Sequence, residues 1–233
     1  MDLTKGGEKC QIDILRLQKL SRCDIIFAMA QRFFTADFHL GSHATNVRMR
    51  RPFKDVEAMN RGIINVVNQR APSRSDIVVH IGDFCQYGID RHYADPEIQR
   101  GLKVKPSSYI DSFKCTLILV EGNHDRTNRV KAACRAMKTN VGSFPNVTVG
   151  HYPTNDPNAV GTFLDCRGHN MGIHLCGHVH DAWRHLYDTE HNILNINCGL
   201  DAWNFVPLSE SKLDGYIGSI IARRGLPYRK PNH

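Results

Sequence analysis

The chain has 233 residues, of which 41% are hydrophobic and 23% are charged, and this favours one globular domain over a disordered or collagen-like chain. Lysine and arginine number 30 against 23 acidic residues, so the formal net charge is +7, and 13 histidines are present. No apolar run approaches the roughly 20 residues that cross a bilayer, so no membrane association is expected.

In chain order, the patterning predicts an N-terminal extension over residues 1–31, a central domain over 32–208 and a basic C-terminal tail over 209–233. Buried-type strands are predicted at 32–37, 76–81, 114–120, 146–149, 172–176 and 192–199. Helices are predicted at 52–70, with Pro52 near the first turn, and at 126–138. Continuous apolar strands that alternate with helices are typical of an α/β fold with a buried sheet.

The eight cysteines are spread along the chain without a CxxC pair, which disfavours a zinc ribbon. Several lie in apolar runs, as Cys115 and Cys176 do, and these are expected to be small core residues. No signal-peptide pattern is visible at the N-terminus. We therefore expect a cytoplasmic protein with reduced thiols.

Polar residues of the kinds that bind metals follow five of the predicted strands. They are Asp37 and His39 in DFH, Asp83 in GD, Asn123 and His124 in GNHD, His151, and His178 and His180 in GHVH. Single motifs of this kind have ordinary structural explanations, such as turn chemistry for GD. The carboxyl ends of parallel strands face one crevice, however, so we expect the whole set to converge on one site.

This set of motifs resembles the calcineurin-like metallophosphoesterases over roughly residues 32–208. The small stand-alone bacterial and phage members are the most similar, through TADFHLG at 35–41, HYP at 151–153 and NCGLDAWNFVPLS at 197–209. The resemblance implies a four-layer α/β/β/α sandwich. It also implies a dinuclear hydrolase of phosphoesters.

By that resemblance, one divalent metal would be bound by Asp37, His39, Asp83 and His180. The second would be bound by Asp83, Asn123, His151 and His178, with Asp83 as the bridge. Carboxylate and imidazole donors suit Mn, which is favoured here, and also Fe, Zn, Co or Ni. Two such ions would clamp the phosphoryl oxygens and supply hydroxide as the nucleophile.

The resemblance also gives His124 the position of a general acid for the leaving group, and the alternative is that it only positions the phosphate. Asp125 would then either orient His124 or cap the helix predicted at 126–138. The protein Ser/Thr phosphatases read GDxxDRG where this chain has GDFCQYG at 82–88, so protein phosphatase activity is not expected.

Four further residues are candidate substrate contacts: His43, Asn46, Arg126 and Tyr152. The alternatives are a polar loop for the first two, a solvated basic face for the arginines and core packing for aromatic residues. Arg48, Arg50 and Arg51 form a basic run that either attracts polyanions or forms a solvated surface. Trp203 either stacks on a substrate ring or packs in the core.

The expected function is hydrolysis of phosphodiesters, with a small molecule or a nucleotide as substrate and nucleic acid as a further possibility. A phosphomonoesterase on the same site is the first alternative. A non-catalytic scaffold of the same fold is disfavoured because every ligand position is filled. A basic nucleic-acid-binding protein without catalysis is the remaining alternative, and its binding would survive the loss of Asp83.

Overall fold

The computed structural model describes residues 30–88, 103–160, 162–164 and 170–224. The chain divides into two units between Ala30 and Gln31, and all described residues except Ala30 belong to the second unit. The extension predicted at 1–31 lies almost wholly outside the described residues. None of the helices in the described part of the chain is long and apolar enough to span a membrane.

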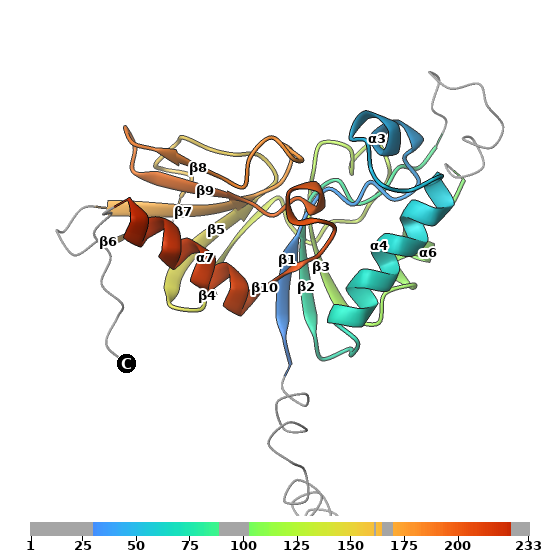
Figure 1. Ribbon diagram of the computed structural model, residues 1–233, viewed down its shortest axis with the longest axis horizontal. Coiled ribbons are helices and arrows are strands. Elements are labelled where there is room, and N and C mark those ends of the chain that lie inside the picture. Colours follow the sequence, from blue (N-terminus) through green and yellow to red (C-terminus); the bar gives the residue numbers. More distant parts are fainter. Residues whose placement is uncertain (1–29, 89–102, 161, 165–169, 225–233) are drawn as a thin grey trace, which may run out of the picture. The chain divides into compact units, whose positions relative to one another are not determined.

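The first sheet has four strands in the order β10-β1-β2-β3 (Figure 1). Its strands are β1 (Arg32–Thr35), β2 (Ile77–Ile81), β3 (Thr116–Val120) and β10 (Leu208–Ser209). The first three are parallel, and β10 is antiparallel to β1. Phe34 pairs with Val79 on one face and Phe33 with Val78 on the other, and all four side chains are buried. Burial on both faces explains why these strands are apolar without alternation.

The second sheet has the order β4-β5-β7-β9-β8, and β6 pairs with β7. Its strands are β4 (Ala136–Val141), β5 (Phe144–Gly150), β6 (Thr162–Leu164), β7 (Asn170–Cys176), β8 (His185–Asp188) and β9 (Ile193–Asn197). The strands β5, β7 and β9 run parallel to one another, and β4 and β8 are antiparallel to their neighbours.

The main core lies between the two sheets. Val149, Leu175 and Ile196 align across β5, β7 and β9, and they share one buried cluster with Phe34 and Val79 of the first sheet. The predicted mixed α/β fold is confirmed, and it contains two sheets. The four-layer order itself stays a prediction.

Helix α4 (Val56–Arg70) covers the other face of the first sheet, because Met59, Ile63 and Val67 are buried at four-residue spacing in the cluster that contains Phe33. It begins after Asp55, whose carboxylate accepts the Ala58 N–H, and not at Pro52 as predicted. The other described helices are α3 (His43–Arg48), α6 (Pro106–Ile110), the 3₁₀ helix η1 (Leu200–Trp203) and α7 (Glu210–Arg223).

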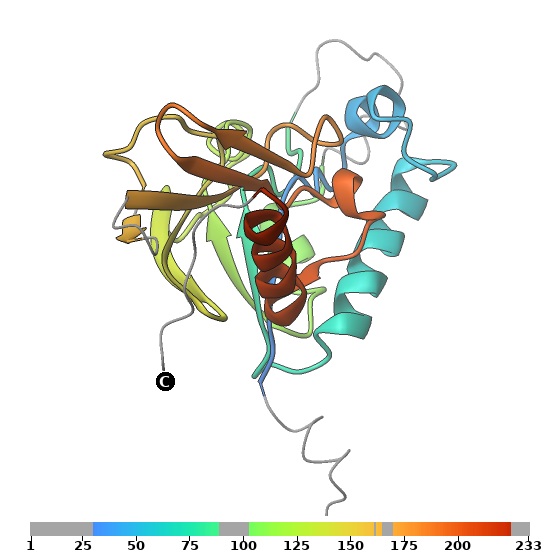
Figure 2. The ribbon, with the colours of Figure 1, turned by 60° about the vertical axis from the view of Figure 1, so that its left-hand side comes forward.

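Helix α7 occupies residues that the sequence assigned to a basic tail. Leu213, Ile217 and Ile221 are buried in the core between the sheets. Arg32 of β1 forms an ion pair with Glu210 at the start of the helix. Helices α4 and α7 therefore pack against opposite faces of the first sheet, and Figure 2 shows the two helices apart from each other.

The helix predicted at 126–138 is wrong. Residues 123–129 form turns and residues 136–141 form strand β4. The backbone of this segment pairs with β3 before β4 begins, since the Ala133 N–H donates to Leu119 O (2.7 Å) and the Glu121 N–H donates to Cys134 O (2.8 Å). These long-range bonds outweigh the local helix preference of the sequence.

Candidate metal centre

The predicted site residues come together at the carboxyl ends of five strands, but these strands belong to two sheets and not to one. Asp37, Asp83 and Asn123 follow β1, β2 and β3 of the first sheet. His151 follows β5 of the second sheet, and the GHVH segment at 177–180 follows β7. The site therefore lies where the two sheets meet.

Left-handed backbone marks the loops that carry these side chains. Positive φ angles occur at Asp37 (59°), His39 (47°), Asp83 (60°), His178 (70°) and His180 (49°). Such conformations are uncommon outside glycine and gather where surrounding structure enforces them. The loops after β1 and β2 are hydrogen-bonded to each other here. The Asp37 N–H donates to Gly82 O and the His39 N–H donates to Asp83 O, each at 3.0 Å.

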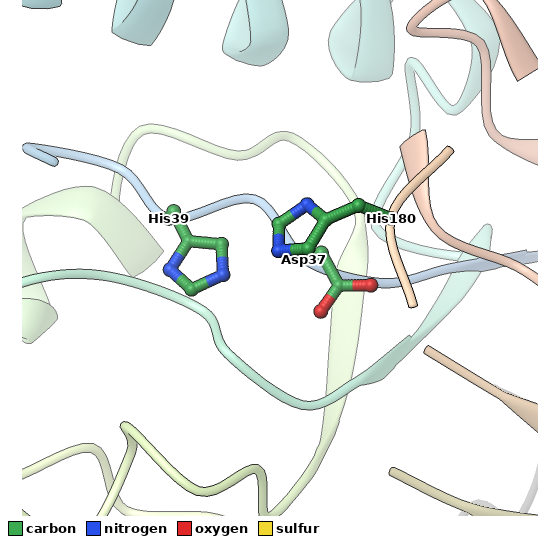
Figure 3. Close-up of side chains that lie close together, drawn as sticks. All are labelled: Asp37, His39 and His180. Carbon is green, nitrogen blue, oxygen red and sulfur yellow. The ribbon is translucent and has the colours of Figure 1, made fainter. Parts of the chain in front are cut away.

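Two groups of potential ligand atoms form in this region, with the atoms of each group within 4.8 Å of one another. The first contains Asp37, His39 and His180 (Figure 3). The second contains Asp37, Asp83 and His151. All of these residues except His180 are buried.

Asp37 belongs to both groups, and Asp83 of the second group also lies close to His39 of the first. The Oδ2 of Asp83 is 3.4 Å from His39 Nε2 and 3.4 Å from His151 Nε2. Asn123 joins on the side of His151, where its Oδ1 is 2.9 Å from His151 Nε2 and 3.2 Å from His178 Nδ1. The geometry thus brings together all seven residues predicted as metal ligands.

The donor atoms fit a divalent cation. His151 Nδ1 is engaged by Ile81 O (2.9 Å) and His180 Nδ1 by Asp201 Oδ2 (2.8 Å), and each contact leaves the ring's Nε2 available as a ligand. His39 Nε2 is buried and has no hydrogen-bond partner. Leaving such an atom unsatisfied costs about 1–3 kcal/mol, and a metal ligand position would remove that cost.

Burial decides the direction of the pKa shift for Asp37 and His39, but not for Asp83. It raises the pKa of Asp37 to about 6, and the neighbouring His180 and His151 act in the opposite direction. It lowers the pKa of His39 well below its usual value. Burial also acts to raise the pKa of Asp83, but contact with His151 and the charge of His39 outweigh it, and the pKa lies below its usual value.

His151 responds in the reverse sense. Burial acts to lower its pKa, but the contact with Asp83 outweighs burial and raises the pKa to about 9. Without a metal, the protein therefore holds Asp83 and His151 as an ion pair. A metal that binds this imidazole has to displace its proton.

His124 lies at the solvent side of the site. Its side chain is 48% exposed, and its Nε2 is 4.0 Å from Asp83 Oδ2. Its backbone N–H donates to Asp83 Oδ1 (2.9 Å), and its ring lies edge-on to the ring of His39. The imidazole is thus within reach of a group bound over the ligands, as a general acid requires.

Asp125 fills neither of the two predicted roles. Its carboxylate is buried and accepts the N–H groups of Gly122 (2.7 Å), Asp83 (2.9 Å) and Phe84 (2.9 Å). It ties the loop after β3 to the loop after β2. Gly122 makes this close approach possible, since a Cβ there would lie 2.3 Å from Asp83 N.

The candidate substrate contacts are distributed unevenly. Asn46 is buried and its amide donates to Phe53 O (3.2 Å), so it faces the protein and not the solvent. His43 is partly buried at the first position of α3, and Arg126 is exposed in the turn after His124. Tyr152 is 53% exposed, and its ring centroid is 4.7 Å from that of His178. Tyr152 is therefore in contact with a predicted ligand.

The sequence missed two residues that support the site. Arg51, expected in a basic surface run, has a buried guanidinium that binds both oxygens of Asp201 at 2.8 and 2.9 Å. It also donates to Asp37 O (2.7 Å) and Phe38 O (2.8 Å). Asp201 in turn holds His180, so this pair orients ligands from two distant motifs.

Comparisons with known proteins agree with the motifs. The family model described as calcineurin-like phosphoesterase matches residues 33–169. The comparison with curated proteins gives no match. Among solved structures, a protein of unknown function from Aquifex aeolicus is 18% identical, with a TM-score of 0.49, over 81% of this chain and 100% of that chain.

Proposed function

This chain belongs to the calcineurin-like phosphoesterases, whose family model spans more than half of its residues, and from that membership we propose that it is a dinuclear metal-dependent phosphodiesterase. Membership and the ligand groups support a metal-dependent phosphoesterase. The proposal adds the number of metals, the preference for diesters and the roles of individual residues.

The position of Asp83 is the observation that carries the proposal. Its Oδ2 is equally distant from His39 and from His151, and these histidines belong to the two different ligand groups. One carboxylate within reach of both groups is the arrangement that a bridging ligand needs. Asp37, His39 and His180 would complete one metal site. Asn123, His151 and His178 would complete the other.

When bound, two divalent cations supply positive charge for the phosphoryl oxygens and lower the pKa of water. The protein adds only two carboxylates, Asp37 and Asp83, against that charge, so the loaded site is net positive and attracts a phosphate. In this proposal His124 gives a proton to the departing oxygen, and its half-exposed side chain, with Nε2 4.0 Å from Asp83 Oδ2, supports that role.

The environment of Arg51 supports a diester as the substrate. Its guanidinium is committed to Asp201 and to two backbone carbonyls, and it does not face the ligands as a phosphate clamp would. A diester carries one negative charge and a monoester carries up to two. Because Arg51 is held by Asp201, it contributes no hydrogen bond to the second negative charge of a monoester.

The test compares bis-p-nitrophenyl phosphate with p-nitrophenyl phosphate in the Mn²⁺-reconstituted protein. We expect faster turnover of the diester. We expect Asp83→Asn to bind less metal and to lose more than about 100-fold in activity, because both metals lose a ligand. Asp76→Asn is the matched control. Asp76 is a buried acid that directly precedes β2, at the end of the strand away from Asp83, so the variant should retain both metals.

The role of His124 is tested with diesters of increasing leaving-group pKa. His124→Ala should keep its metals and lose about 10²–10⁴-fold on poor leaving groups, with a smaller loss on p-nitrophenol. Equal loss on all leaving groups would show that His124 only positions the phosphate. Full activity of Asp83→Asn would overturn the dinuclear assignment.

A further inference from the structure

A pocket of about 550 Å³ opens beside the metal centre, on the face of the second sheet that points away from the core. It lies between strands β4, β5 and β7 and the segment 152–159, and His151 and Tyr152 form the wall it shares with the site. Its volume is in the range of pockets that hold small organic molecules.

Small residues form the floor. Ala136 of β4 pairs with Gly150 of β5, next to the ring of His174. A Cβ on Gly150 would lie 3.3 Å from His174 Cε1 and 4.0 Å from Ala136 Cβ. The floor therefore carries a single methyl group from Ala136 and no side chain from Gly150, where the ring of His174 leaves little room for one.

The polar groups of the wall are already satisfied. His174 Nδ1 is 2.9 Å from Thr148 Oγ1, and His174 Nε2 is 2.9 Å from Tyr152 O. Burial lowers the pKa of His174, so its ring is neutral. Pro153 and Ala159 add apolar surface. Such walls suit a group that contributes flat apolar area and few hydrogen bonds.

The rim adds an aromatic ring and positive charge. Tyr152 is more than half exposed, and its ring contacts the ring of His178 at the candidate metal centre. Lys138 of β4 and Arg135, which directly precedes β4, are exposed and line the pocket, and Arg135 also forms an ion pair with Glu121 (3.1 Å). A substrate that combines a flat ring with negative charge matches this combination, because rings stack on tyrosine and cations attract the anion.

We propose that this pocket binds the base of a nucleotide whose phosphate lies at the metal centre. The proposal rests on the proposed phosphodiesterase function for the position of the phosphate. The base would lie on the floor formed by Ala136 and Gly150. Tyr152 would cover the path from the metals to the pocket, and Arg135 and Lys138 would face the anionic part of the ligand.

The test measures dissociation constants of AMP and of ribose 5-phosphate, which lacks the base, by titration calorimetry with the Mn²⁺-loaded protein. We expect AMP to bind about 10-fold more tightly, since stacking of one base is worth a factor of this order. Ala136→Phe fills the floor and should weaken AMP to the level of ribose 5-phosphate without changing the latter. Lys131→Phe is the control, because it adds the same ring in the segment before β4, at a residue that does not line the pocket.

Ala159→Phe fills the pocket from the opposite wall and should act as Ala136→Phe does, so a folding defect in one variant does not decide the result. Equal affinities of the wild-type protein for the two ligands, or unchanged AMP binding in both filled variants, would overturn the pocket assignment. Hydrolysis of bis-p-nitrophenyl phosphate is measured on the same samples. If the wild-type protein hydrolyses the diester but binds both ligands equally, only the pocket assignment is overturned. If it binds AMP more tightly but does not hydrolyse the diester, only the proposed function is overturned.

Discussion

Asp201 connects a buried arginine to a predicted metal ligand. Its carboxylate accepts from Arg51 at 2.8 Å and contacts His180 Nδ1 at 2.8 Å. Burial acts to raise its pKa, but these contacts outweigh burial and lower the pKa to about 2, so the group is ionised at neutral pH. The negative charge fixes which nitrogen of His180 faces the site.

We predict that Asp201→Asn lowers metal affinity about 10–100-fold, because a neutral amide holds both His180 and Arg51 more weakly. Metal titration monitored by calorimetry measures the change. Asp188→Asn is the matched control, since Asp188 contacts His191 Nδ1 at the same 2.8 Å on the edge strand β8, away from the site. Equal metal affinity in both variants would contradict the role given to Asp201.

His80 is a residue whose burial has a different consequence. Both of its ring nitrogens lack partners, and its neighbours are the rings of Phe38 and Phe84. Burial lowers its pKa to about 3, with Asp83 acting in the opposite direction. The unfolded chain takes up a proton below about pH 6.5 and the folded chain does not, so this group reduces stability as the pH falls from about 6.5 towards 3.

We predict that His80→Leu weakens this acid sensitivity in the metal-free protein. At pH 8 the variant should be at least as stable as the wild type, because two unsatisfied nitrogens leave the core. At pH 5 the advantage of the variant should be larger. Urea unfolding at the two pH values measures this difference, and an equal difference at both would contradict the prediction.

Prediction from sequence succeeded for residues whose chemistry shows locally and failed where long-range burial decides. The ligand motifs follow strands, so their convergence could be expected. Arg51 and Asp201 are 150 residues apart, and the basic run around Arg51 resembles a solvated surface. The Asp in GLDAW at 199–203, an acid within an apolar stretch, was the available signal.

At the scale of elements, α7 shows how charge can mislead. Its basic residues suggested a tail, yet Ser209 caps the helix by accepting the Lys212 N–H, and Leu213, Ile217 and Ile221 are buried at helical spacing. The segment 126–138 shows the opposite error. Its composition suits a helix, but pairing with β3 and β5 gives turns, an irregular stretch and the first residues of β4 instead.

We predict that Gly215→Ala raises the free energy of unfolding by about 0.5–1 kcal/mol, because alanine favours the helix and nothing lies within 4 Å of its Cβ. Gly62→Ala in α4 is the matched control. A Cβ at Gly62 would lie 2.6 Å from Phe53 Cε1, so the same substitution there should give no gain. Chemical denaturation measures the free energy of unfolding of both variants. The absence of a gain in Gly215→Ala would contradict the prediction.

At the scale of the whole unit, the metal centre joins two sheets. Asp37, Asp83 and Asn123 come from the first sheet, and His151, His178 and His180 come from the second. The rule that parallel strand ends share one crevice predicted the convergence, but it applies within a sheet. That a second sheet supplies three of the seven predicted ligands depends on packing of the core between the sheets, which motif order does not reveal.

Ligands from both sheets lead us to predict that metal stabilises the whole unit. At a free Mn²⁺ concentration of 100 times the dissociation constant, the added stability should be about 2.7 kcal/mol, and a chelator should remove it.

In the metal-free protein, the raised pKa of His151 stabilises the fold below about pH 6.5, and this contribution is lost as the pH rises through about 9. Metal has to displace that proton, so its affinity should increase from pH 6.5 to 9. Thermal unfolding with Mn²⁺ and with chelator across this range measures both effects, and identical melting temperatures would contradict a metal site that links the sheets.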